Sequence, residues 1–481
     1  MKRRRAYIST GLTAVTVVMI WGLAMSAPPA PPPPTPVRFG PDTQLSVATS
    51  GLHDFVEPAI AASPPDPRNL VAGFFGETGK FPSSCFFRSS RDGGTTWAPG
   101  GMLAVKTPDD LCADPSLAAD SAGTFYYAYL DLSPGATDLR VARSTDGGAT
   151  FPESPIVVAS GTTSAGPNPD KDWIAVDTQR NSKYRGTIYL TYTDVASGAT
   201  QIAVVISRNA GRSWSAPVAI SPPIPFTDPI VEIAEGSLPV VAPDGTVFVF
   251  YLDANQQTMR SSIRFVKSMD GGKSWSQPAD AAADLPTPGL FFTLDDGSPG
   301  FGSDAFAGFL AWSYPTAAIA PDGTLNVAWT DFPQGSCTIL VRDGYRPTPA
   351  CTNADVRLAV SGDGGRSWSA PVKVSDDTGQ TDQFFPWIAA HPSGLVSLVW
   401  QDKRLDPDNA NFDLFYTNTG DGRRFLPNVR VSTQSSLGGH AGFIGDYNNL
   451  VVSGDSIVPI WNDLRNSSGV EIFAARGTLV P

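Results

Sequence analysis

The sequence predicts an all-β protein, a β-propeller of four-stranded antiparallel blades. Three observations lead to this fold class. Glycine (46 residues) and proline (44 residues) are abundant, and the apolar runs between them are short. No long stretch has the periodicity of an amphipathic helix. One short turn motif recurs along most of the 481 residues, and such repetition is typical of propellers.

The repeated motif reads Ser-Arg-Asp-Gly-Gly-Thr-Thr-Trp at residues 90–97 and recurs five more times, the sixth copy being one residue shorter. Its Asp-Gly and Gly-Gly pairs supply the positive φ angles of a tight hairpin. The Asp side chain can accept N–H bonds across the turn, and Asn can do the same. We therefore expect a structural role for the six turn residues Asp92, Asp146, Asn209, Asp270, Asp363 and Asp421.

A second pattern precedes each turn. It is an apolar strand, a Pro-Asp-Gly-like turn and a strand that ends near an acid, as in residues 239–253. The pattern occurs seven times, so seven blades are favoured, with six as the alternative. The last copy lacks an outer strand, and residues 43–48 resemble the outer strands elsewhere. We expect this N-terminal strand to complete the last blade, because closure pairs two open sheet edges.

The N-terminus indicates export. Residues 1–27 begin with four basic residues after Met1 and continue as a mostly apolar run, which predicts a cleaved signal peptide or an uncleaved signal anchor. Residues 28–42 are proline-rich and are expected to form an extended spacer, or else a disordered leader. The propeller would then occupy residues 43–481. The expected location is the periplasm, the cell surface or the medium, with membrane contact only through the N-terminal segment.

Charge and histidine content restrict the partners. The net charge is −12, and no basic stripe lies outside the first five residues, which argues against nucleic-acid binding. The three histidines, His53, His391 and His440, are dispersed, and no cysteine spacing resembles a zinc site. We therefore predict no metal and no cofactor, and we expect a monomer.

Four cysteines in an exported chain predict disulfides. Three pairings are possible. Cys85–Cys112 and Cys337–Cys351 are favoured because short loops close most easily. The first bond would join blades one and two, and the second would close an excursion within blade five.

The Asp turns, five of which are good copies of a Ser-x-Asp-x-Gly-x-Thr-Trp spacing, resemble the Asp-box repeats of bacterial sialidases (neuraminidases), and the resemblance covers essentially all of residues 43–481. It implies a sialidase-like propeller. Sialidases of this type hold the substrate carboxylate with an arginine triad and use a tyrosine nucleophile activated by a glutamate, with an aspartate as acid/base. Their first arginine lies in a Phe-Arg-Ile-Pro-like segment. The segments around Arg38 and Arg68 differ from it, so this arginine is not assigned here.

A ligand would meet the face opposite the Asp turns. We call this the top face; it is built from the loops between second and third strands and the loops between blades. Acids recur there in nearly every blade and are expected to brace loops. The ligand-binding candidates are Lys171, Asp172, Glu235, Arg404 and Arg465. The two arginines, in adjacent blades, could form a fork for a carboxylate or sulfate, or each could pair with the Asp of its own blade.

Two further features bear on chemistry. Asp446 and Tyr447 place a tyrosine beside an acid, similar to the sialidase nucleophile, and are the catalytic candidates. Insertions at residues 277–312 and 335–353 are expected on the top face. The first carries aromatics that could stack on sugars or form a satellite core: Phe291, Phe292, Phe301, Phe306, Phe309 and Trp312.

Two functions follow from these features. The first is a surface module that binds a glycan or another surface ligand through the top face. The alternative is an exo-sialidase or related glycoside hydrolase that acts on anionic sugars. Convergence of Lys171, Arg404 and Arg465 at one pocket would distinguish them.

Overall fold

The computed structural model describes residues 30–46, 53–77, 83–105, 110–133, 135–151, 154–162, 168–196, 198–225, 232–255, 258, 260–286, 313–331, 353–438, 443–466 and 469–480. It also describes the backbone of four short strands, β20 (Phe292–Thr293), β21 (Pro299–Gly300), β24 (Cys337–Leu340) and β25 (Thr348–Cys351). Residues 1–31 and 32–481 form separate units, and the architecture below is that of the second. The described residues form strands and turns, and among them no helix is long and apolar enough to cross a membrane.

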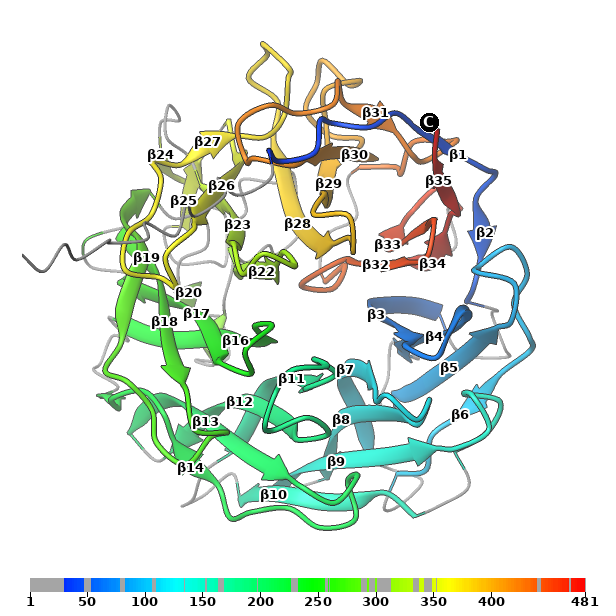
Figure 1. The fold of residues 1–481 in the computed structure, drawn as a ribbon. Coiled ribbons are helices and arrows are strands. Elements are labelled where there is room, and N and C mark those ends of the chain that lie inside the picture. Colours follow the sequence, from blue (N-terminus) through cyan, green and yellow to red (C-terminus); the bar gives the residue numbers. More distant parts are fainter. Residues whose placement is uncertain are drawn as a thin grey trace, which may run out of the picture. The chain divides into compact units, whose positions relative to one another are not determined.

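Seven antiparallel blades surround a central axis, so the predicted seven-bladed propeller is confirmed (Figure 1). The strands of each blade are given from inner to outer. Blade one has β3 (His53–Ser63), β4 (Asp66–Glu77), β5 (Ser84–Ser90) and β6 (Gly101–Met102), and blade two has β7 (Leu111–Ala119), β8 (Phe125–Ser133), β9 (Ala136–Ser144) and β10 (Ile156–Thr162). Blade three has β11 (Asn168–Val176), β12 (Ile188–Ala196), β13 (Ala199–Ser207) and β14 (Val218–Ala219), with β15 (Ile224–Pro225) also on β13, and blade four has β16 (Glu232–Val241), β17 (Val247–Asn255), β18 (Arg260–Ser268) and β19 (Ala279–Pro286). The last three blades are β22 (Thr316–Ile319), β23 (Leu325–Asp331), β26 (Asp355–Ser361) and β27 (Val372–Lys373); β28 (Gln383–Ala390), β29 (Val396–Asp402), β30 (Asp413–Thr419) and β31 (Val429–Arg430); and β32 (Asn449–Ser453), β33 (Ser456–Asp463), β34 (Glu471–Ala474) and β2 (Thr43–Gln44).

The N-terminal strand closes the ring, as predicted. Strand β2 pairs with β34, and the N–H of Leu45 donates to the carbonyl of Ile472 at 2.7 Å. A second N-terminal strand, β1 (Val37–Phe39), pairs with β35 (Gly477–Leu479). Thr35, within the expected spacer, exchanges two hydrogen bonds with Asn418 of blade six. Residues 35–46 are therefore part of the propeller.

The Asp-box turns are internally hydrogen-bonded. Asp146 accepts from Ser144 Oγ at 2.7 Å and from both the N–H and the hydroxyl of Thr150, and Ser144 Oγ accepts from Gly148 N–H. Asn209 accepts from Ser213 N–H at 2.9 Å and donates to its hydroxyl, so the Asn copy works as expected. Hydrogen bonds, first of all from Ser274, hold the pKa of Asp270 well below its usual value.

Neighbouring turns are linked by basic side chains. Arg91 donates to the carbonyl of Asp146, Arg208 donates to Gly271, and Lys267 donates to Gly364. Each link joins one blade to the next. The turn face of the ring is thus stabilised by contacts between blades as well as within them.

In most blades, the acid at the end of the second strand bonds to another side chain of its own blade. Trp400 donates its indole N–H to Asp402 at 2.7 Å, and Trp461 donates to Asp463 at 2.8 Å. Other blades pair this acid with an arginine, as in Asp131–Arg140 at 2.8 Å. This repeated position therefore braces the blades.

A disulfide joins blades one and two. It links Cys85 of β5 to Cys112 of β7, both fully buried, and is the first of the two expected pairs. Cys337 and Cys351 are register partners in the β24–β25 hairpin. Their side chains, His440 and the aromatic side chains of the 277–312 insertion lie outside what the structure describes.

Candidate functional site

A cavity of about 320 Å³ lies at the axis, where the inner strands begin on the top face. It is lined by residues of blades one to four and by segments that precede β22 and β32. The lining residues are Glu57, Phe75, Ser83, Leu111, Ala113, Asp114, Leu132, Asp170, Lys171, Glu235, Tyr314, Phe443 and Asp446. We call this cavity the central pocket.

The same backbone irregularity in several inner strands positions these side chains. Strands β3, β7, β11, β16 and β28 share a β-bulge at an equivalent point, where the inner strand has one extra residue relative to its second strand. Glu57, Asp114 and Lys171 occupy the bulges of the first three blades with φ of 55°, 50° and 40°. Such φ values are uncommon for residues with a side chain and cluster at functional sites. The bulges bring charged side chains from successive blades to one cavity.

Four carboxyl groups of the pocket have raised pKa values. Burial, reinforced by Asp114, raises the pKa of Glu57 well above its usual range, and burial likewise raises that of Glu235. Burial raises the pKa of Asp446 to about 8 and that of Asp170 to about 6. Neighbouring carboxyl groups add to each shift, and Lys171 opposes it. At neutral pH the pocket therefore contains both protonated and ionised carboxyl groups.

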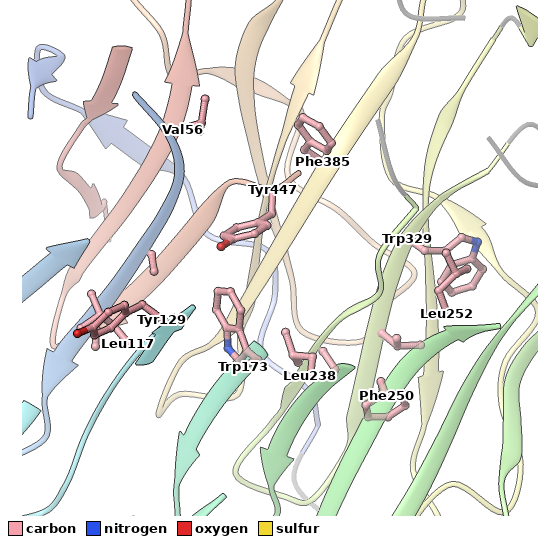
Figure 2. Packing of buried hydrophobic residues seen from close by; sticks show 14 of the residues in the cluster. Val56, Leu117, Tyr129, Trp173, Leu238, Phe250, Leu252, Trp329, Phe385 and Tyr447 are labelled. Atoms are coloured by element: carbon pink, nitrogen blue, oxygen red, sulfur yellow. The ribbon is translucent and has the colours of Figure 1, made fainter. Parts of the chain in front are cut away.

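Aromatic rings hold the Lys171 ammonium. Its Nζ lies 3.9 Å from the ring centroid of Tyr447, 4.9 Å from Trp173 and 5.8 Å from Tyr314. Trp173 and Tyr447 pack edge to face with ring centroids 5.4 Å apart. Figure 2 shows the two side chains next to each other. Trp387 of β28 packs against Trp173 with its ring tilted by 45° and the ring centroids 4.6 Å apart. These contacts fix the lysine by cation–π attraction.

The structure brings several predicted site residues together. Lys171, Glu235 and Asp446 line the central pocket. Asp172 lies beside them, fully buried, and accepts from Ser116 Oγ at 2.7 Å.

Tyr447 has a buried hydroxyl. It donates to the carbonyl of Pro115 at 3.2 Å and lies 3.5 Å from Glu57 Oε2. Burial raises the pKa of Tyr447 well above 10, which opposes formation of a phenolate nucleophile.

The two candidate arginines lie elsewhere and do not line the pocket. Arg404 pairs with Asp402 at 2.7 Å and with Asp376 at 2.6 Å. Arg465 pairs with Asp463 and Asp42, both at 2.6 Å. Each arginine therefore makes the contact with its own blade's Asp that the sequence offered as the alternative to a ligand fork.

Four pocket residues with ionisable side chains were not among the sequence candidates: Glu57, Asp114, Asp170 and Tyr314. A sequence signal for three of them exists. Glu57, Asp114 and Tyr314 each precede a proline at an equivalent point of the repeated pattern, as Phe385 does in blade six, although Tyr314 lies just before its strand. That point is the bulge position in blades one, two and six.

In a loop with a calcium-like sequence, residues 406–413, the first acid bonds to the backbone of the loop itself. Asp406 accepts from the N–H groups of Asp408 and Asn411. The Nζ of Lys403 donates to the carbonyl of Asn409 at 3.1 Å, so an ammonium group occupies this loop. Among the described residues, no group of three or more His, Cys, Asp or Glu side chains is arranged to hold a metal ion.

Comparison with known proteins agrees with this architecture. Residues 186–384 match the model of the BNR repeat-like domain. A curated sialidase from Micromonospora viridifaciens is 27% identical over 327 residues, which are 60% of this chain and 46% of that protein. The chain is a sialidase-like propeller of the BNR-repeat type. It spans less than half of the length of that relative.

Solved structures similar to the sialidase-like propeller are distant in sequence. A polysaccharide lyase, an ulvan lyase, aligns with a TM-score of 0.50 at 11% identity, covering 88% of this chain and 94% of the lyase. A Hadza microbial sialidase aligns with a TM-score of 0.47 at 12% identity, covering 92% of each chain. At these identities the likeness concerns the fold alone.

Proposed function

We propose that this protein binds a glycan end in the central pocket of its top face. The observation that carries the proposal is the pocket itself: a cavity of about 320 Å³ that combines carboxyl groups with the aromatic side chains of Phe75, Tyr314 and Phe443. Carboxyl groups bind sugar hydroxyls by hydrogen bonds, and aromatic faces pack on sugar rings. The volume is at the lower end of the ~300–1,000 Å³ of small-molecule sites, which suits a terminal sugar. The curated sialidase relative supports a glycan ligand.

A glycan array followed by titration calorimetry tests the proposal. Glu235→Gln and Phe443→Ala each change a pocket wall and should weaken binding by about tenfold or more, equivalent to ~1.4 kcal/mol. Asp244→Asn is the matched control. It neutralises a carboxylate in the β16–β17 turn, on the opposite face, where Asn can still accept the Thr246 N–H. An array without binders, or binding that both pocket variants leave unchanged, would contradict the proposal.

Glycoside hydrolysis is a second candidate, favoured by the separation of acid strengths in the pocket. Asp446, with a pKa of about 8, is protonated at neutral pH, whereas Asp170, at about 6, is mostly ionised. A proton donor beside an ionised carboxylate is the arrangement that glycosidases use. Turnover of fluorogenic glycosides should fall at least about 100-fold in Asp446→Asn if this carboxyl is the acid. Absence of turnover on every substrate would leave binding as the function.

We also propose that the protein is exported. The basic and apolar N-terminal sequence and the Cys85–Cys112 disulfide both fit an oxidising compartment outside the cytoplasm. Cell fractionation with N-terminal sequencing should find the domain outside the cytoplasm, and the new N-terminus would tell a signal peptide from an anchor. A reduced cytoplasmic protein would contradict export.

A further inference from the structure

The charges at the central pocket are unbalanced. One ammonium group and five carboxyl groups line the cavity, and its described lining holds no arginine. The carboxyl groups are those of Glu57, Asp114, Asp170, Glu235 and Asp446. One ammonium neutralises one carboxylate, so the remaining groups depend on bound protons or on an incoming cation.

One carboxyl oxygen of the pocket is a buried hydrogen-bond acceptor without a donor in the described part of the chain. Oδ1 of Asp446 is buried and has no hydrogen-bond partner among the residues that the structure describes. A buried acceptor without a donor is costly, and an ammonium group is the strongest donor that a ligand could bring to it. The Lys171 ammonium, meanwhile, lies among the rings of Tyr447, Trp173 and Tyr314.

The geometry points to a sugar with a protonated amine, such as a hexosamine end with a free amino group, as the ligand that the central pocket selects. This inference rests on the proposed glycan binding and deepens it. The ammonium would donate to the pocket carboxylates, and the rings of Phe75, Tyr314 and Phe443 offer faces that attract a cation. Neutral sugars would lack the charge pairing.

An anionic sugar is disfavoured by the same groups. Its carboxylate would add negative charge to a cavity whose carboxyl groups already retain protons because of burial and mutual repulsion, and the lining offers it one ammonium group. The arginines that could have offset this, Arg404 and Arg465, are paired with aspartates outside the pocket. The preference thus departs from the anionic substrate that the sialidase resemblance implies.

The test is a matched set of monosaccharides measured by calorimetry: the methyl glycosides of glucosamine, N-acetylglucosamine and glucose, and of sialic acid. Work at about pH 6 keeps the amine protonated, since amino groups of this kind titrate near ~8. The free-amine sugar should bind at least about tenfold tighter than the other three. It should also release protons, seen as a dependence of the heat on the buffer. Equal affinities, or preference for the acetylated or anionic sugar, would overturn the inference.

Pocket variants separate this inference from the proposed function. Asp446→Asn should reduce the amine preference at least several-fold while affinity for methyl glucoside changes less, and near-ultraviolet circular dichroism checks that the variant is folded. If neutral sugars bind in the pocket without any gain from the amine, the inference fails and glycan binding stands. If cyclohexylamine binds but no sugar does, cation recognition stands and glycan binding fails. If neither binds, both are wrong.

Discussion

At the residue scale, burial gives ordinary carboxyl groups unusual acid strength. Glu57, Asp170 and Asp446 come from different blades, and the pKa of each is raised first by burial and then by the negative charge of Asp114. Lys171 limits the shifts without cancelling them. The folded protein therefore retains protons that the unfolded chain would release above about pH 4.

This cluster predicts that stability falls as pH rises. Between about pH 4 and pH 8 the folded state binds more protons than the unfolded state at these sites, so they contribute stability that is lost as pH rises through the folded pKa values. Asp446→Asn removes one such group, beside Asp114, Asp170 and Lys171, and should flatten the decline. Urea unfolding at a series of pH values measures it, with Asp244→Asn as control. Identical slopes for wild type and Asp446→Asn would refute the prediction.

At the element scale, the Asp-box turn is a closed hydrogen-bond unit. The Ser at its start donates to the Asp and accepts from the second Gly, and the Asp then binds the Thr or Ser four residues on. The same contacts recur in the boxes of Asp92, Asp270 and Asp363. The hairpin geometry is thereby set locally.

Replacing the Asp of one Asp-box turn should lower the free energy of unfolding by an amount that depends on whether the new side chain can still accept hydrogen bonds. Asp146→Ala removes the acceptor for Ser144 and Thr150 and should cost about 1 kcal/mol or more of the free energy of unfolding. Asp146→Asn should cost less, because Asn209 makes the equivalent contacts in blade three. Chemical denaturation compares the two variants. Equal losses would show that the carboxylate charge, and not the acceptor geometry, stabilises the turn.

At the scale of the whole molecule, closure of the ring depends on residues near both termini. Strand β2 is the outer strand of a blade whose other three strands lie between residues 449 and 474. Leu45 is buried in the core between blades seven and one, and Asp42 pairs with Arg465. Opening this junction would expose two sheet edges.

Truncation should reveal that junction. A chain starting at residue 32 retains β1 and β2 and should unfold at the temperature of the full-length protein. A chain starting at residue 47 loses both strands and should be markedly destabilised or aggregate, as shown by its thermal unfolding and its elution in gel filtration. Equal stability of the two chains would mean that β2 does not close the ring in solution.

The disulfide should act as a second clamp. The Cys85→Ala/Cys112→Ala variant should lose about 2–4 kcal/mol, because the bond closes a 27-residue separation between two blades. Guanidinium unfolding of this variant measures the loss, and wild type with reductant should approach it. A variant as stable as wild type would show that blade packing alone fixes this interface.

The blade architecture follows from local patterns in the sequence. The Asp-Gly turns and the alternating strands are local patterns, because backbone conformation and face alternation depend on neighbours in the chain. Seven copies of the strand pattern were therefore enough to predict seven blades. The N-terminal strand of blade seven was also recognisable, from its likeness to residues 428–432.

The tertiary structure alone decided the pocket. The charges of Arg404 and Lys171 were equally visible in the sequence, but only packing shows that Arg404 pairs with Asp402 and Asp376 while Lys171 lines the cavity. Glu57 and Asp446 are about 390 residues apart, and only the closed ring places both against one space. Their shifted pKa values follow from burial and mutual repulsion, which depend on distances across the axis and on no local pattern.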